Sequence, residues 1–346
     1  MSISNREPKT VFANAFSSVT LSGVTQDLQS SAPLDVVLTR GKPRENRPLI
    51  VDTPGVITGP RPPKRLPSKL PSPGNMNLHL TLGKKIGRGR VGRVFEATID
   101  LHRSSPELAD MLMPPLVVKV SRRQDANKIA REAFYYDEME CLQGSVIPRY
   151  YGFFEATIPP NIEFTPWAHD KLTRSSHRYD ASSDLSESEY DTDSNFEEDG
   201  SDLEEVDENG ERYSDSDDDT PPMVVTPTKV SILIMERVGG RLPLGEMLPD
   251  GLREELDSMY LDLSKLGVDH VDIRYFNILY APPPLPELPF LPSPLSQRVY
   301  NYRLVDFDNS YKSNRGPALW YGYHRCLLSR LLMNLPYGDI YEPWEM

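Results

Sequence analysis

Two short segments hold most of the residues that could carry out chemistry. Residues 270–277 read HVDIRYFN, and residues 304–308 read LVDFD. In this pattern the carboxylate of Asp272 is a candidate general base. The side-chain oxygens of Asn277 and Asp306 are candidate ligands for Mg²⁺, because a hard cation needs few protein oxygens when phosphate groups supply the others. The spacing therefore predicts a base and a magnesium site on one rim of a cleft.

A complete GxGxxGxV pattern, GRGRVGRV, lies upstream at residues 87–94. Glycines allow a turn to lie close over phosphate groups and to offer backbone N–H donors. A dinucleotide-binding turn would run from a strand into a helix, whereas here strand-like runs flank the glycines at residues 78–86 and 91–97. The pattern therefore predicts a hairpin that covers a nucleotide. Its candidate binding residues are Gly87, Gly89, Gly92 and Val94.

One lysine, Lys119, interrupts an apolar strand at residues 116–120. A lysine there is costly to bury unless anionic groups meet it, and phosphate oxygens with a helix carboxylate are suitable partners. The helix expected over residues 125–142 carries three glutamates: Glu132, Glu138 and Glu140. We favour Glu132, because it lies beside an inward-facing stripe at helical spacing. Glu138 is the alternative.

A further apolar strand at residues 231–238 runs into a glycine pair. We expect this strand to line an adenine site, with hydrogen bonds from the base to the backbone near Glu236 and Val238. Met235 would then stand at the back of the adenine pocket. A plain buried strand followed by a turn is the alternative interpretation.

From about residue 78 to residue 310, the chain resembles the eukaryotic protein-kinase-like superfamily, in the compact divergent form of many fungal sequences. The resemblance rests on the motifs above and on the local text REA at 131–133, LQG at 142–144 and IPRYYG at 147–152. It implies that the chain uses ATP and Mg²⁺. The roles that it implies are phosphate binding by Lys119, support of Lys119 by Glu132, proton acceptance by Asp272, and Mg²⁺ binding by Asn277 and Asp306.

The resemblance also implies an α+β, two-lobed protein-kinase-like fold, with a small antiparallel β-sheet in the N-lobe and a shortened helical C-lobe. The expected parts are a disordered Pro-rich basic arm (1–75), the N-lobe (76–167 and 221–239), a disordered acidic insert (168–220) and the C-lobe (240–346) with a Pro-rich loop (281–297).

Two features depart from the family pattern. Asp308 stands where most protein kinases have glycine, as in the small-molecule branch that includes aminoglycoside and choline phosphotransferases. Asp306 is followed by only 40 residues, without the Ala-Pro-Glu motif that precedes the peptide-docking helices. We expect a protein hydroxyl as the phosphoryl acceptor. A small-molecule acceptor and a nucleotide-binding pseudokinase without turnover are the alternatives.

The formal net charge of −13 is distributed unevenly along the chain. Residues 180–219 contain 19 acidic residues and one arginine, whereas residues 1–75 contain ten basic and five acidic residues. A block so charged and so poor in aliphatic residues cannot bury enough apolar surface to fold. Its charge also argues against a nucleic-acid partner, because nucleic-acid-binding surfaces are basic.

The chain offers no membrane or secretion signal. Its first ten residues hold no apolar stretch, and no run approaches 18 apolar residues. The two cysteines are far apart, which favours reduced thiols. We therefore expect a cytoplasmic or nuclear protein with no membrane partner. Residues 283–286, PPLP, could form polyproline II and meet a polyproline-reading partner, although an enlarged hairpin loop is the favoured interpretation.

Overall fold

The computed structural model describes residues 9–46, 48–50, 61–167, 228–285 and 288–340, all within one compact unit. The acidic insert expected at residues 168–220 lies outside the described residues. Residues 221–227 of the expected N-lobe and parts of the expected arm also lie outside them.

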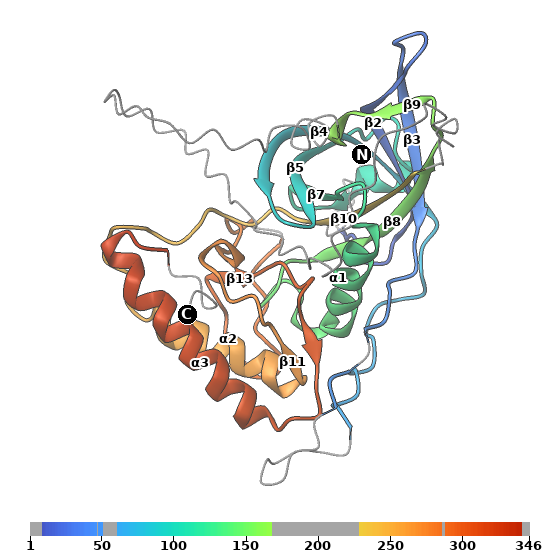
Figure 1. Ribbon diagram of the computed structural model, residues 1–346. Helices are drawn as coiled ribbons and strands as arrows, with labels where there is room; N and C mark the ends of the chain where they lie inside the picture. Colours follow the sequence, from blue (N-terminus) through green and yellow to red (C-terminus); the bar gives the residue numbers. More distant parts are fainter. Residues whose placement is uncertain (1–8, 47, 51–60, 168–227, 286–287, 341–346) are drawn as a thin grey trace, which may run out of the picture. The chain divides into compact units, whose positions relative to one another are not determined.

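One eight-stranded sheet dominates the described chain (Figure 1). Its order is β3-β8-β10-β7-β5-β4-β2-β9, and β2 also pairs with β3, so seven strands close into a barrel. All neighbours are antiparallel except β2 and β4, which makes the barrel mixed. The strands are β2 (Phe16–Asp27), β3 (Pro33–Arg40), β4 (Met76–Arg88), β5 (Gly92–Ile99), β7 (Leu116–Ser121), β8 (Tyr150–Ile158), β9 (Ile162–Phe164) and β10 (Thr228–Glu236).

Side chains alternate between two cores on the central strands β7 and β10. Val118 and Ile234 belong to the core that fills the barrel. Val117 and Leu233 belong to a second core, which includes the buried face of helix α1 (Ala126–Glu138). Both faces of these strands are therefore buried, which explains why their sequences read as continuous apolar runs.

The structure contradicts the two-lobed protein-kinase-like fold that the sequence predicts. The described chain is mostly β, with a closed seven-strand mixed barrel instead of a small antiparallel sheet. Only three α-helices occur among the described residues: α1, α2 (Leu252–Lys265) and α3 (Pro317–Asn334). The physical reason is that two additional strands pair with both edges of the sheet and remove its free edges.

Those two strands come from the region that we expect to be a disordered arm, residues 1–75. β2 and β3 bury Phe16, Val19 and Leu38 completely. Apolar residues recur along both strands without strict alternation, and the proline-rich sequence that follows them dominates the composition of the region. The expectation of a disordered arm is therefore wrong for β2 and β3.

Two short strand pairs bring the candidate catalytic segments together. β12 (Ile278–Tyr280) pairs with β13 (Tyr302–Leu304), and β11 (Val268–Asp269) pairs with β14 (Tyr311–Lys312). Asn277 directly precedes β12 and Val305 directly follows β13, so the two segments meet at the same end of this pair. The remaining elements are β1 (Lys9–Thr10), β6 (Met111–Leu112) and 3₁₀ turns at Pro106–Asp110, Glu140–Leu142, Tyr275–Asn277 and Leu335–Tyr337.

A buried carboxylate anchors the Pro-rich connection between β12 and β13, which we expect at residues 281–297. Oδ2 of Asp262, on α2, accepts hydrogen bonds from Ser293 Oγ at 2.6 Å and Ser296 Oγ at 2.7 Å. Tyr300 donates to the same oxygen at 3.0 Å. This connection is therefore held at its C-terminal end, close to where the chain enters β13.

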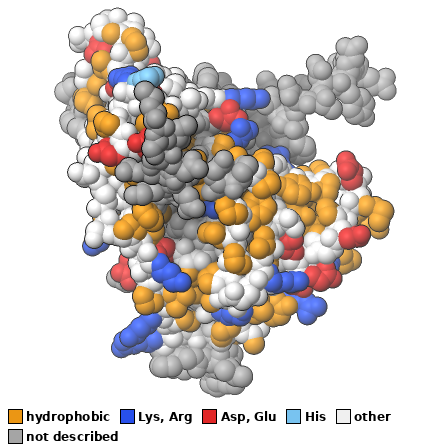
Figure 2. Space-filling view, turned by 180° about the vertical axis from the view of Figure 1, so that it is seen from behind, with side chains coloured by type: hydrophobic (Ala, Val, Ile, Leu, Met, Phe, Trp, Pro, Cys, Tyr) orange, Lys and Arg blue, Asp and Glu red, His pale blue; other side chains and the backbone are white. Residues whose placement is uncertain are grey.

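Apolar side chains gather on the face of the molecule that is seen in Figure 2, between scattered charged groups. Met247, Met333 and Tyr337 are the most exposed large apolar residues of the described chain. Exposed apolar side chains are ordinary on protein surfaces, and we assign these no role. No helix in the described part of the chain combines the length and the apolar character that crossing a membrane requires.

Two neighbouring positions on β3 test the closure of the barrel. Leu38 is 0% exposed and Val37 is 60% exposed. Leu38→Ala should lower the free energy of unfolding by about 2–5 kcal/mol, because it removes barrel core. Val37→Ala should change it by less than about 0.5 kcal/mol. Urea denaturation measures both, and equal small effects would mean that β3 does not pack as described.

Candidate active site

Lys119 is the centre of the candidate site. It lies on β7, on the face that points away from the barrel interior, and is only 6% exposed. Its Nζ lies 2.7 Å from Glu132 Oε2 and 2.6 Å from Asp306 Oδ1. Burial alone would lower the pKa of Lys119, but attraction by Asp306 and Glu132 outweighs burial and raises this pKa well above its usual value. The ammonium group therefore stays charged.

Helix α1 supplies the first partner of Lys119. Glu132 shares the buried face of the helix with Ile129, Ala133 and Tyr136. Burial raises the pKa of Glu132 to about 8, against the attraction of Lys119. Of the described residues, none donates a hydrogen bond to its second oxygen, Oε1. The alternative glutamate, Glu138, instead forms an ion pair with Lys312.

Asp306 reaches Lys119 from a left-handed backbone conformation, with φ of 65°. Such a conformation is uncommon outside glycine, although aspartate adopts it more readily than most residues. Val305 N donates to Asn277 O at 3.1 Å, and His270 Nε2 lies 3.1 Å from Asp306 O. Burial lowers the pKa of His270 to about 4, so this imidazole is neutral and braces the turn.

Three aspartates lie together beside Lys119. One carboxylate oxygen from each of Asp272, Asp306 and Asp308 lies within 4.8 Å of the others. Burial raises the pKa of Asp272 and of Asp308, and repulsion by Asp306 raises both further. Burial would also raise the pKa of Asp306, but Lys119 outweighs it and lowers this pKa. The cluster therefore crowds three carboxyl groups around a single buried ammonium group.

The candidate base is held by two neighbours. Asn277 Nδ2 donates to Asp272 O at 2.9 Å and to Asp272 Oδ2 at 3.1 Å. Arg274 Nε lies 2.6 Å from Asp272 Oδ1. The amide group of Asn277 thus orients Asp272, and only its carbonyl oxygen could ligate a metal. Arg274 is not among the candidates that we predict from the sequence. Its position two residues after Asp272 could have indicated an ion pair with that carboxylate.

The glycine hairpin between β4 and β5 lies over the acidic cluster. A β-carbon at Gly89 would lie 3.9 Å from Asp306 Oδ2, and Arg90 NH2 lies 3.5 Å from Asp308 Oδ2. A β-carbon at Gly92 would lie 2.6 Å from Val120 O, whereas one at Gly87 would make only ordinary contact. Close packing therefore requires glycine at position 92 and not at position 87. Val94, on β5, pairs directly with Lys119.

Two of the residues expected to bind adenine are not accessible to a ligand. Met235 and Glu236 are buried, and Glu236 Oε2 lies 2.6 Å from Arg149 NH1. Glu236 N donates to Arg149 O at 2.9 Å, so this N–H is already occupied within the chain. Val238 is half-buried and lies two residues after Glu236, which leaves Val238 as the better candidate for contact with an adenine base.

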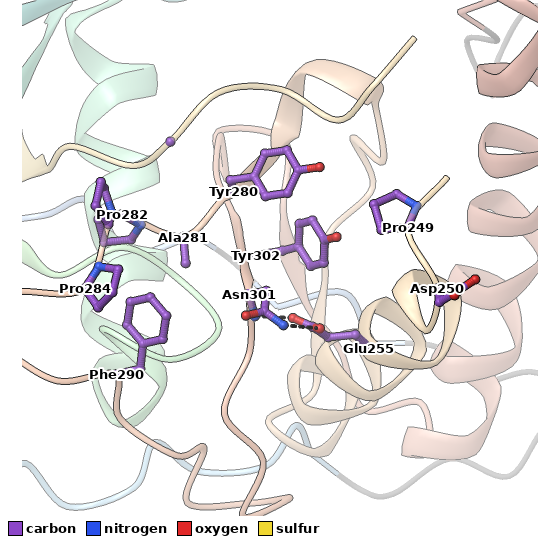
Figure 3. A pocket seen from close by; sticks show the side chains of 12 residues that line it. Pro249, Asp250, Glu255, Tyr280, Ala281, Pro282, Pro284, Phe290, Asn301 and Tyr302 are labelled. Carbon is purple, nitrogen blue, oxygen red and sulfur yellow. Dashed lines mark hydrogen bonds between the residues drawn. The ribbon is translucent and has the colours of Figure 1, made fainter. Parts of the chain in front are cut away.

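A cavity of about 500 Å³ lies elsewhere, between α2 and the β12–β13 pair (Figure 3). Tyr280 and Tyr302 form part of its wall, with their ring centroids 5.1 Å apart. Among the residues that the structure describes, its lining includes two acids, Asp250 and Glu255, and no lysine or arginine. Such a lining repels phosphate, so the phosphate groups of a nucleotide fit better beside Lys119.

Comparisons of the sequence with protein-family models and with curated proteins find no match. The resemblance to protein kinases therefore stays a prediction.

The close approach at Gly92 gives a test of the hairpin geometry. Gly92→Ala should lower the free energy of unfolding by about 1–3 kcal/mol, because the added methyl group overlaps the Val120 carbonyl. Gly87→Ala, its matched control, should change it by less than about 1 kcal/mol. Denaturation curves of both variants provide the measurement, and a tolerated Gly92→Ala would show that the hairpin lies farther from β7.

Proposed function

We propose that this chain binds ATP together with Mg²⁺ and transfers the γ-phosphoryl group to a hydroxyl acceptor. The observation that carries the proposal is the buried cluster in which Lys119 contacts Glu132 and Asp306, next to Asp272 and Asp308. A charged lysine that two elements hold in place is suited to binding phosphate oxygens. The glycine hairpin above the cluster supports the same proposal.

The acidic cluster fits a magnesium ion. Ligands in an octahedral Mg²⁺ site are about 3.0 Å apart when adjacent and about 4.2 Å apart when opposite, because each bond is about 2.1 Å long. The carboxylate oxygens of Asp306 and Asp308 lie within 4.8 Å of each other, which is close to the spacing of two opposite ligands. Burial raises the pKa of Asp308, and a divalent cation beside this carboxyl group would stabilise its charged form. When bound, Mg²⁺ would neutralise charge on the β- and γ-phosphates.

Each residue has a distinct role in the proposed reaction. Lys119 would exchange Asp306 for phosphate oxygens, while Glu132 keeps the lysine in place. Asp306 and Asp308 would then face the metal. Asp272, oriented by Asn277 and Arg274, would accept the proton of the attacking hydroxyl. Because transfer passes through a loose transition state, this positioning and charge neutralisation would provide most of the catalysis.

A protein hydroxyl is the acceptor that we propose. A small-molecule hydroxyl is the second candidate, and the burial of Asp308 within the acidic cluster favours it. Asp308 adds a third carboxyl group, which can bind more cation charge. This residue stands where most protein kinases have glycine, as in the small-molecule branch. An assay with generic protein acceptors, beside one with aminoglycosides and choline, separates the two candidates.

The role of Asp272 can be tested by its isosteric amide. Asp272→Asn should reduce kcat for phosphoryl transfer by about 10²–10⁴-fold, because the amide cannot accept the hydroxyl proton. The affinity for Mg·ATP should change by less than about threefold, since Asp272 is not proposed to hold the phosphates. Radiolabelled ATP measures transfer, and exposed Asp250→Asn is the control. Full activity of Asp272→Asn would exclude it as the base.

The role of Lys119 can be tested by binding alone. Mg·ATP should raise the melting temperature of the wild-type protein, because a ligand of the native state stabilises it. Lys119→Met should weaken Mg·ATP binding by about 10–100-fold, through loss of a charged contact to phosphate. The control is Lys84→Met, an exposed lysine on β4. If both variants bind equally well, phosphate does not bind at Lys119. Tight binding without any transfer would support the pseudokinase alternative.

A further inference from the structure

The segment that follows β3 runs beside helix α1 (Figure 1). We call its described residues, 41–46 and 48–50, the strap. Gly41 N donates to Phe153 O at 2.9 Å, which continues the pairing of β3 with β8. Farther along, Arg44 N donates to Ala130 O on α1 at 2.9 Å. The strap therefore begins on the barrel and then follows the helix that carries Glu132.

The strap also binds the segment that carries the aspartates. Leu49 N donates to Lys312 O at 2.8 Å, in a short parallel bridge that pairs Leu49 with Ser313. Lys312 in turn forms an ion pair with Glu138 on α1, and both side chains are largely buried. Residues 306–313 and helix α1 are thus connected both directly and through the strap.

One side chain of the strap joins both elements at once. Asn46 Nδ2 donates to Tyr135 OH at 3.1 Å and to Ser310 O at 3.3 Å. Tyr135 lies one helical turn from Glu132, and Ser310 lies two residues after Asp308. Tyr135 and Ser310 are both buried and Asn46 is half-buried, so these hydrogen bonds are partly shielded from competing water.

We infer that Asn46 is a positioning residue for the Lys119–Glu132–Asp306 cluster. Its amide fixes helix α1 relative to residues 306–313, and thereby fixes the separation of the two carboxylates that contact Lys119. The inference deepens the proposed phosphoryl transfer and rests on it for its kinetic consequences. Its structural consequence, coupled order of α1 and residues 306–313, does not depend on catalysis.

Asn46→Asp is the sharpest variant, because it keeps the shape and replaces the donor by a carboxylate that faces the Ser310 carbonyl. We expect kcat for phosphoryl transfer to fall about 10–100-fold, since small displacements of catalytic groups are costly. The KM for ATP should change by less than about threefold. Asn46→Gln keeps an amide donor and should recover part of the loss. Glu45→Gln, at the exposed neighbouring position, should behave as wild type.

Hydrogen exchange of the full-length protein provides the readout that is independent of activity. In Asn46→Asp, amides of residues 126–138 and 306–313 should exchange faster together, while β4 and β5 remain as in the wild type. An unchanged exchange rate in these two segments overturns the inference. Faster exchange throughout the barrel overturns it too, because the role of Asn46 would then be general stabilisation.

The kinetic and exchange results also separate this inference from the proposed function. A wild-type protein that transfers no phosphoryl group would contradict the proposed function, and the exchange result alone would then decide the role of Asn46. An active wild type with an equally active Asn46→Asp would overturn the inference and leave the proposed function intact.

Discussion

A buried ammonium group between two carboxyl groups is the interaction on which the candidate site depends. Lys119 on β7, Glu132 on α1 and Asp306 after β13 belong to elements that are far apart in the chain. Removing these charges from water is expensive, and their mutual attraction compensates only when the geometry is good. The positions of all three elements are therefore constrained by one cluster of charges.

The barrel provides the rigid support that this cluster of charges requires. β7 lies between β5 and β10 within a closed ring of strands, so it has no free edge. Val118 and Val120, on either side of Lys119, pack into the barrel core. The alternation of side chains then presents Lys119 on the opposite face, toward α1. The strand that carries the ammonium group is thus fixed from both sides.

The sequence contains local signals for most of the site and weak signals for the barrel. Lys119, Asp272, Asn277 and Asp306 lie within short motifs whose spacing can be recognised without the fold, and the structure places them close together. Closure of the barrel depends on pairing between residues that are distant in the chain, such as Val19 with Leu78. No local pattern specifies such a pairing. The prolines after β3 dominate the composition of residues 1–75 and therefore favour a disordered arm over the strands. The contacts of Asn46 are equally invisible, because an isolated asparagine in a polar segment has no distinguishing pattern.

The central position of β10 has a consequence for how the chain acquires its structure. β10 pairs with both β7 and β8, yet in the sequence it follows the long stretch of residues 168–227. During synthesis from the N-terminus, the other six strands of the barrel emerge before it. Non-local pairing of this kind slows folding, because the entropy of a large loop must be lost before any contact forms. Until residues 228–236 have been synthesised, β7 and β8 therefore lack the strand that both pair with, and the ring of strands cannot close.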